Sequence, residues 1–292
     1  MSYTISGYST ALFSTWYFIE ELGILFDTGD GVSAGLLQKA RKITNVFISH
    51  ADRDHLTGLL QLNQLNARDG FPIIHYPANS GSFPAMETFS KKFDPPVNGT
   101  IWKAIQANDE IKIKDDLFVQ SLRNDHVEAA PEIIKSLSYK IFQTKTKLRP
   151  GIASLPQDRI KELITNEGKE KLTMEVRTNV LSYSGDTPVD DYEKWDHSKI
   201  LIHEATFLDA PGAGKVNTHG NKHINLEEVI KMVSEINIET LILGHFSSRY
   251  SAEQIDENIR SLCEKYLIKI PVFRILPGLI HKDILKEVPI NT

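Results

Sequence analysis

The chain has 292 residues and a formal net charge of −5 at pH 7, with 41% hydrophobic and 24% charged residues. This composition suits a globular protein with an ordinary core, and its charge excludes gripping nucleic acid through bulk positive charge alone. The single cysteine, Cys263, excludes an intrachain disulfide, and no apolar run reaches membrane-spanning length, so we expect a cytoplasmic protein without a membrane segment.

The first half of the chain predicts strands that pair locally and then alternate with helices. Short apolar runs rich in β-branched and aromatic residues predict strands, and apolar residues at helical spacing predict helices. Two strands joined tightly at Leu22-Gly23 come first. The expected strands that follow are in 44–50, 71–77 and 136–144, a hairpin turning at Asp115-Asp116 lies in 109–126, and the helices are in 32–43, 56–67 and 82–93.

The second half alternates strands and helices more regularly. Two expected helices begin with a capping box, formed by Asn225 with Glu228 and by Ser251 with Gln254. The strands are expected in 178–187, 199–207, 239–246 and 271–279, and the helices in 224–236 and 251–266. The charged segment 145–177 predicts a helix plus loop. This order predicts an α+β fold in one domain, 1–292, with two layers of mixed sheet covered by helices on both outer faces.

Five polar clusters each follow an apolar strand. They are "HADRDH" at 50–55, "DH" at 125–126, "SGDT" at 184–187, "HEATF" at 203–207 and "GHFSSRY" at 244–250. Strand ends are rigid, so they can hold functional side chains precisely. Five clusters that carry His, Asp or Glu therefore predict a shared site.

The spacing in "HADRDH" suits a pair of metal ions. His50 and Asp52 point the same way if the strand continues through them, while Asp54 and His55 on the following turn can converge on a second centre. Two-metal hydrolytic sites hold their cations about 3.5–4 Å apart, and zinc, iron and manganese accept imidazole and carboxylate ligands. The alternative is a polar loop whose Asp caps the next helix.

Other histidines and the cysteine have simpler interpretations. His75 and His197 are expected to be ordinary core or surface groups, and Cys263 is expected to be a core thiol at helical spacing with Ile259. The role of His281 is left open.

The motifs resemble those of a known family. "LFDTGDG", "ISHADRDHLTGL", "DH", "SGDT" and "GHF" resemble the metallo-β-lactamase superfamily, which implies a four-layer αββα sandwich. "LIHEATF", a histidine ahead of the next helix, and "HFSSRY" are similar to ribonuclease Z, the tRNA 3′-processing endonuclease. The resemblance implies ligands for two divalent metal ions, with zinc as the expected metal: His50 and His126 on the first, Asp54, His55 and His245 on the second, and Asp186 between them.

The resemblance also implies catalytic roles. A hydroxide between the metals would be the nucleophile, oriented by Asp54. Glu204 and His223 would pair, with His223 protonating the leaving oxygen and His219 as its competitor. Two further residues, Ser247 and Arg249, would clamp the phosphate. A homodimer is implied as well.

Asp52 departs from the family pattern, because it stands where a second histidine is usual. An added carboxylate makes the centre less positive, and a harder oxygen ligand shifts its preference from zinc toward manganese or iron. Asp is also shorter than His, so whether Asp52 reaches the metal is left open.

A second departure concerns the substrate. Between Thr144 and Thr178 the sequence shows no glycine-rich hairpin like the arm with which ribonuclease Z grips tRNA. We expect a metal-dependent hydrolase, a phosphodiesterase or endoribonuclease of ribonuclease Z type acting on a phosphodiester, with tRNA or another RNA as the candidate. The alternatives are a thioester or lactone hydrolase, a di-iron oxidoreductase, and a binding protein with a decayed site.

Overall fold

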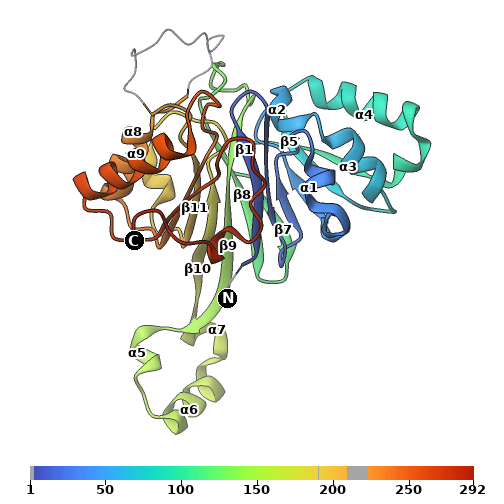
Figure 1. The fold of residues 1–292 in the computed structure, drawn as a ribbon. Coiled ribbons are helices and arrows are strands. Elements are labelled where there is room, and N and C mark those ends of the chain that lie inside the picture. The colour runs from blue at the N-terminus through green and yellow to red at the C-terminus, as the bar shows by residue number, and fades with distance from the viewer. Residues whose placement is uncertain (1–2, 190, 209–222) are drawn as a thin grey trace.

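Two β-sheets pack face to face, and helices cover their outer faces (Figure 1). The computed structural model describes residues 3–189, 191–208 and 223–292. The first sheet has the order β1-β2-β3-β4-β5-β6, with strands β1 (Ile5–Thr10), β2 (Ser14–Ile19), β3 (Ile24–Phe26), β4 (Asn45–Phe47), β5 (Ile73–Pro77) and β6 (Ile101–Ile105). Strands β1 to β3 pair antiparallel and β3 to β6 pair parallel, so the sheet is mixed.

The second sheet is mixed in the same way. Its order is β13-β12-β11-β10-β9-β8-β7, antiparallel from β7 to β10 and parallel from β10 to β13. The strands are β7 (Glu110–Lys114), β8 (Leu117–Arg123), β9 (Leu137–Leu148), β10 (Thr173–Tyr183), β11 (Ile200–Glu204), β12 (Thr240–Gly244) and β13 (Val272–Arg274). The parallel strands need crossover segments, and these place helices on the outer face of each sheet.

The helices fall into three groups. Beside the first sheet are α1 (Val32–Leu36), α2 (Arg53–Leu56), α3 (Leu59–Asn66) and α4 (Ser82–Phe93); beside the second are α8 (Leu226–Glu235) and α9 (Ala252–Lys265); between β9 and β10 are α5 (Pro150–Ala153), α6 (Gln157–Glu167) and α7 (Lys169–Leu172). Short 3₁₀ turns are η1 (Leu37–Lys42), η2 (Pro95–Gly99), η3 (Tyr192–Trp195) and η4 (Ile284–Lys286). Both predicted capping boxes form, at Asn225 and at Ser251.

Three apolar clusters separate the layers. The cluster between the sheets contains Phe26 and Tyr183, the cluster under α8 and α9 contains Ile259 and Cys263, and the third packs α3 through Leu62. Apolar surface is thus buried on both faces of each sheet, which is the physical reason for four layers. The predicted αββα sandwich is confirmed, and Cys263 is a buried core thiol as expected.

The segment 145–177 differs from the prediction. Strands β9 and β10 run on beyond the rest of their sheet as a two-stranded ribbon, in register from Leu148 with Thr173 to Gln143 with Thr178, and carry α5, α6 and α7 at its tip (Figure 1). We call residues 145–177 the arm. The sequence analysis expected no arm because it searched for a glycine-rich hairpin, whereas this arm is charged and helical.

Two strands were missed, β1 and β6. The sequence of β1, "ISGYST", is small and polar, and β6, "IWKAI", is mostly exposed, so neither gives an apolar run. β1 is set by its hairpin with β2, and β6 is set by its pairing with β5. In the described part of the chain, no helix is long and apolar enough to cross a membrane.

Candidate metal centre

The polar clusters meet at one end of the two sheets. His50 follows β4, His126 follows β8, Asp186 follows β10, Glu204 ends β11 and His245 follows β12. Neighbouring strands that end together bring distant parts of the sequence to one place, and these five side chains are all buried. The structure thus places the predicted polar clusters next to one another at these strand ends.

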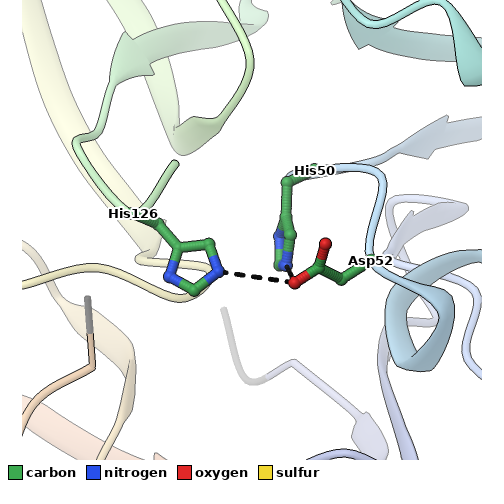
Figure 2. A group of neighbouring side chains, drawn as sticks. All are labelled: His50, Asp52 and His126. Atoms are coloured by element: carbon green, nitrogen blue, oxygen red, sulfur yellow. Dashed lines mark ion pairs between the residues drawn. The ribbon is translucent and has the colours of Figure 1, made fainter. Parts of the chain in front are cut away.

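The first group of candidate ligands is His50, Asp52 and His126. The Asp52 Oδ2 atom lies 3.5 Å from His50 Nε2 and 3.7 Å from His126 Nε2, and Figure 2 shows both rings turned toward the carboxylate. The Asp52 side chain is 46% exposed, while both imidazoles are buried. The His126 and His50 rings hold the pKa of the Asp52 carboxyl well below its usual range. Asp52 is therefore an ionised oxygen donor positioned between two imidazoles.

The second group is Asp54, His55 and His245. The Asp54 Oδ2 atom lies 3.6 Å from His55 Nε2 and 3.4 Å from His245 Nε2. Asp186 lies between the groups, because its Oδ2 is 3.3 Å from Nε2 of both His55 and His245 and 3.9 Å from His50 Nε2. All seven predicted metal residues are thus brought into one cluster, with Asp186 shared.

This cluster fits divalent cations. The buried Nε2 atoms of His50 and His55 have no hydrogen-bond partner among the described residues. A buried polar atom without a partner is costly, and imidazole nitrogens with carboxylate oxygens are the donors that zinc, manganese and iron accept. The donor chemistry and the unpartnered nitrogens together point to a centre that binds divalent metal.

Asp27 contacts the candidate centre, and the sequence analysis did not single it out. It follows β3 with a φ of 54°, and its Oδ2 accepts hydrogen bonds from Ser49 Oγ and the Tyr183 hydroxyl and lies 2.8 Å from His55 Nδ1. The bond at Nδ1 directs His55 Nε2 toward the cluster. An acid directly after a buried strand, in "LFDTGDG", was the signal available in the sequence.

A carboxylate–histidine pair adjoins the second group. His223 Nδ1 lies 3.1 Å from Glu204 Oε2, which also accepts a hydrogen bond of 2.5 Å from the Thr206 hydroxyl. Burial favours a neutral His223 ring, but the Glu204 carboxylate outweighs it and raises the pKa of His223 to about 9. His223 is therefore protonated at neutral pH. Its predicted competitor, His219, lies outside the described residues.

The two predicted phosphate-binding residues lie on the turn that follows His245. The Arg249 Nε–H donates to Ser247 Oγ at 3.0 Å, and the guanidinium carbon lies 5.4 Å from the Phe207 ring centre. Arg249 is exposed, and the Ser247 N–H donates to the carbonyl of Thr206, next to Glu204. The turn thus carries a hydroxyl and a cation within four residues of His245.

Three of the remaining histidines have structural surroundings. His75 stacks on Phe47 with ring centres 4.4 Å apart, the side chain of His197 is 80% exposed, and His281 pairs with Glu287 at 2.8 Å. These positions agree with the interpretation of His75 and His197 as ordinary core and surface groups, and they give His281 a structural contact.

Comparison with known families supplies the decisive observation. A family model described as a β-lactamase superfamily domain matches residues 23–246, more than half of the chain. The chain belongs to the β-lactamase superfamily. The predicted membership of its metallo-β-lactamase branch is confirmed, and with it the prediction of a metal-dependent hydrolase.

Named relatives of this metallo-β-lactamase protein include ribonucleases. The chloroplastic tRNase Z TRZ2 of Arabidopsis thaliana is 29% identical over 287 residues, covering 92% of this chain and 74% of that protein. Two solved structures share the fold: the metallo-β-lactamase fold protein YhfI of Bacillus subtilis (TM-score 0.64, 16% identity, 96% of this chain and 100% of that one) and the short form of human tRNase Z (TM-score 0.61, 17% identity, 96% and 99%). These names do not favour the thioester, lactone or oxidoreductase alternatives.

Proposed function

We propose that this protein is a phosphodiesterase of ribonuclease Z type, an endoribonuclease that acts on tRNA or another RNA. The observation that supports it best is the adjacency of two groups of metal-ligand type, which share Asp186, to the Glu204–His223 pair. A two-metal hydrolase of phosphodiesters needs both parts, a charged centre for attack and a proton donor for the leaving oxygen.

The distances between side chains divide the proposed ligands into two groups, one for each ion. His50, Asp52 and His126 would hold the first ion, Asp54, His55 and His245 the second, and Asp186 would bridge them. Bound divalent ions would polarise the phosphodiester and lower the pKa of a water toward neutrality. Zinc is the first candidate, with manganese or iron as alternatives because of Asp52.

The chain's own groups would handle the proton. The Asp54 carboxylate lies close to the Nε2 atoms of His55 and His245, where it could orient an attacking water. His223 would donate its proton to the leaving oxygen, and Glu204 holds the ring in place through Nδ1, leaving Nε2 as the donor atom.

Ser247 and Arg249 would bind the phosphate. A guanidinium presents parallel N–H donors that match phosphate oxygens, and Arg249 is exposed at the end of the strand that also delivers His245. Its hydrogen bond to Ser247 and its position over the Phe207 ring limit how far the side chain can move.

The arm supports RNA as the substrate class. Residues 145–177 carry eight Lys or Arg and five Asp or Glu, a net charge of +3, whereas the whole chain has −5. Lys145, Lys147, Arg149 and Lys161 are among its exposed cations. Phosphate backbones are bound chiefly through such contacts, and several relatives are named tRNase Z. The arm thus supplies local positive charge for RNA binding in a chain whose net charge is negative.

Two further expectations belong to this proposal. A single buried cysteine suits a reducing compartment, so we place the protein in the cytoplasm. A homodimer remains a prediction from the resemblance to ribonuclease Z.

Turnover of two small substrates tests the reaction class. Metal-loaded protein is expected to hydrolyse bis(p-nitrophenyl) phosphate, to lose this activity in a chelator, and to leave a thioester intact. Asp186→Ala is the matched control, because it removes the shared carboxylate. Thioester hydrolysis without phosphodiester hydrolysis would overturn the proposal.

A further inference from the structure

Asp52 gives the two halves of the centre the same donors. Each group has two imidazole Nε2 atoms and one aspartate Oδ2, His50 and His126 with Asp52 in the first and His55 and His245 with Asp54 in the second. Asp186 Oδ2 adjoins both groups. Both prospective sites therefore offer two nitrogens, one private carboxylate and one shared carboxylate.

Asp52 is not engaged as a helix cap. It occupies the N-cap position of α2 with extended backbone angles, φ −71° and ψ 146°, yet its side chain makes no capping hydrogen bond to the described backbone. Asp is a preferred N-cap residue because its carboxylate can accept from the first turn. Here the carboxylate instead faces the His50 and His126 rings (Figure 2), so the simple structural explanation for an aspartate at this position fails.

The two sites differ in exposure. The Asp52 side chain is 46% exposed and that of Asp54 is 11% exposed. Asp54 Oδ2 also accepts a hydrogen bond from the Leu12 N–H at 3.1 Å, which fixes it further. Asp186 Oδ2 is nearer to the second pair of imidazoles, at 3.3 Å, than to His50, at 3.9 Å. The first site is thus the more open of two chemically matched sites.

We propose that Asp52 is a metal ligand that makes the first site accept Mn²⁺ or Fe²⁺ as well as Zn²⁺, so that both sites admit the same hard or borderline divalent ions. A carboxylate oxygen suits Mn²⁺ better than an imidazole nitrogen does, because the oxygen is a harder donor and carries negative charge. Three carboxylates also offset most of the charge of two divalent cations, which lets the ions lie close together. This inference rests on the ligand assignment of the proposed function.

Metal titration of the metal-free chain tests the inference without using activity. Wild type, Asp52→His and Asp52→Glu are titrated separately with Mn²⁺ and Zn²⁺, and bound metal is measured by equilibrium dialysis and elemental analysis. Wild type and Asp52→Glu are expected to bind two Mn²⁺. In Asp52→His one of the two Mn²⁺ is expected to bind about tenfold or more weakly, while two Zn²⁺ remain bound. Asp115→His, on the exposed β7–β8 turn, is the control for an added surface histidine.

Three results would overturn the inference: unchanged Mn²⁺ binding in Asp52→His, equal weakening of Mn²⁺ and Zn²⁺ in that variant, or wild type that binds only one Mn²⁺. If Asp52→His does not fold by circular dichroism, Asp52→Ala replaces it, with loss of one Mn²⁺ expected against its retention in Asp52→Glu. Hydrolysis of bis(p-nitrophenyl) phosphate is measured in parallel. Persistent hydrolysis with an unchanged metal preference overturns this inference alone, whereas a wild type that binds no metal overturns the proposed function as well.

Discussion

At the scale of single residues, the centre depends on what each imidazole does with its second nitrogen. Nδ1 of His50 lies 2.9 Å from Ser49 Oγ, that of His55 lies 2.8 Å from Asp27 Oδ2, and that of His245 lies 2.9 Å from Thr206 Oγ1. Each contact fixes the ring so that Nε2 faces the carboxylates. Loss of such a partner typically lowers metal affinity by about 10- to 100-fold.

Thr206 is the clearest case, because its hydroxyl contacts both His245 and Glu204. Thr206→Val keeps the shape of the side chain and removes both hydrogen bonds. We expect it to weaken one metal site by about 10- to 100-fold, measured by metal competition with a chelator. Thr206→Ser is expected to restore most of the affinity. Equal affinities in the Val and Ser variants would contradict this role.

The role of His223 can be separated from metal binding by the choice of leaving group. His223→Ala is expected to slow cleavage of an unactivated RNA phosphodiester by about 10²- to 10⁴-fold. Hydrolysis of bis(p-nitrophenyl) phosphate should fall far less, because p-nitrophenolate leaves without a proton. Rates on both substrates are compared with wild type at equal metal content. The same loss on both substrates would show that His223 is not the acid.

Arg249 is expected to act on binding alone. Arg249→Ala removes a charge-assisted contact to phosphate and should raise the KM for a phosphodiester by about 10- to 100-fold. Metal content, measured by elemental analysis, should not change, because Arg249 contacts Ser247 and aromatic rings rather than the cluster. Loss of metal in this variant would make Arg249 a structural residue.

At the scale of elements, short sequence patterns predicted the features that depend on neighbouring residues in the chain. The capping boxes, most strands and the polar clusters at strand ends follow from short-range patterns in the sequence, whereas the ligand role of each residue comes from the resemblance to metallo-β-lactamases and stays a prediction. Asp27 was missed because its role depends on Ser49 and His55, which reach it only through the pairing of β3 with β4. The arm was missed because its ribbon is held by pairing between β9 and β10 across 24 intervening residues.

The helical tip of the arm, residues 149–172, can be replaced by a short turn. Leu148 and Thr173 are paired, so a two-residue Asn-Gly turn in place of residues 149–172 would close the ribbon. We expect this variant to keep hydrolysis of bis(p-nitrophenyl) phosphate and to bind tRNA at least about tenfold more weakly, since phosphate contacts dominate RNA affinity. Binding is measured by filter retention at fixed salt. Undiminished tRNA binding would exclude the tip of the arm from the interface.

At the scale of the whole molecule, the ligands come from both sheets. His50 follows β4 of the first sheet, Asp186 and His245 follow β10 and β12 of the second, and the apolar cluster between the sheets joins them through Phe26 and other buried residues. The site therefore exists only if the sheets pack correctly. That the chain is one domain from 1 to 292 stays a prediction.

Unfolding tests the single-domain prediction. We expect one cooperative thermal transition, with coincident loss of circular dichroism and tryptophan fluorescence. Because the ligands join both sheets, added Mn²⁺ or Zn²⁺ should raise Tm, and removal of metal should lower it. Two separate transitions would contradict the single-domain prediction, and a Tm that does not respond to metal would contradict a metal centre that joins both sheets.

The most direct test of the central claim follows RNA cleavage as metal is returned to the metal-free protein. The substrate is a tRNA with a 3′ extension, and bound metal is measured in the same samples. Cleavage is predicted to appear only as occupancy approaches two ions per chain, and to be absent in Asp186→Ala at every metal concentration. An RNA that stays intact at full occupancy, or one cut equally well by Asp186→Ala, would contradict the account.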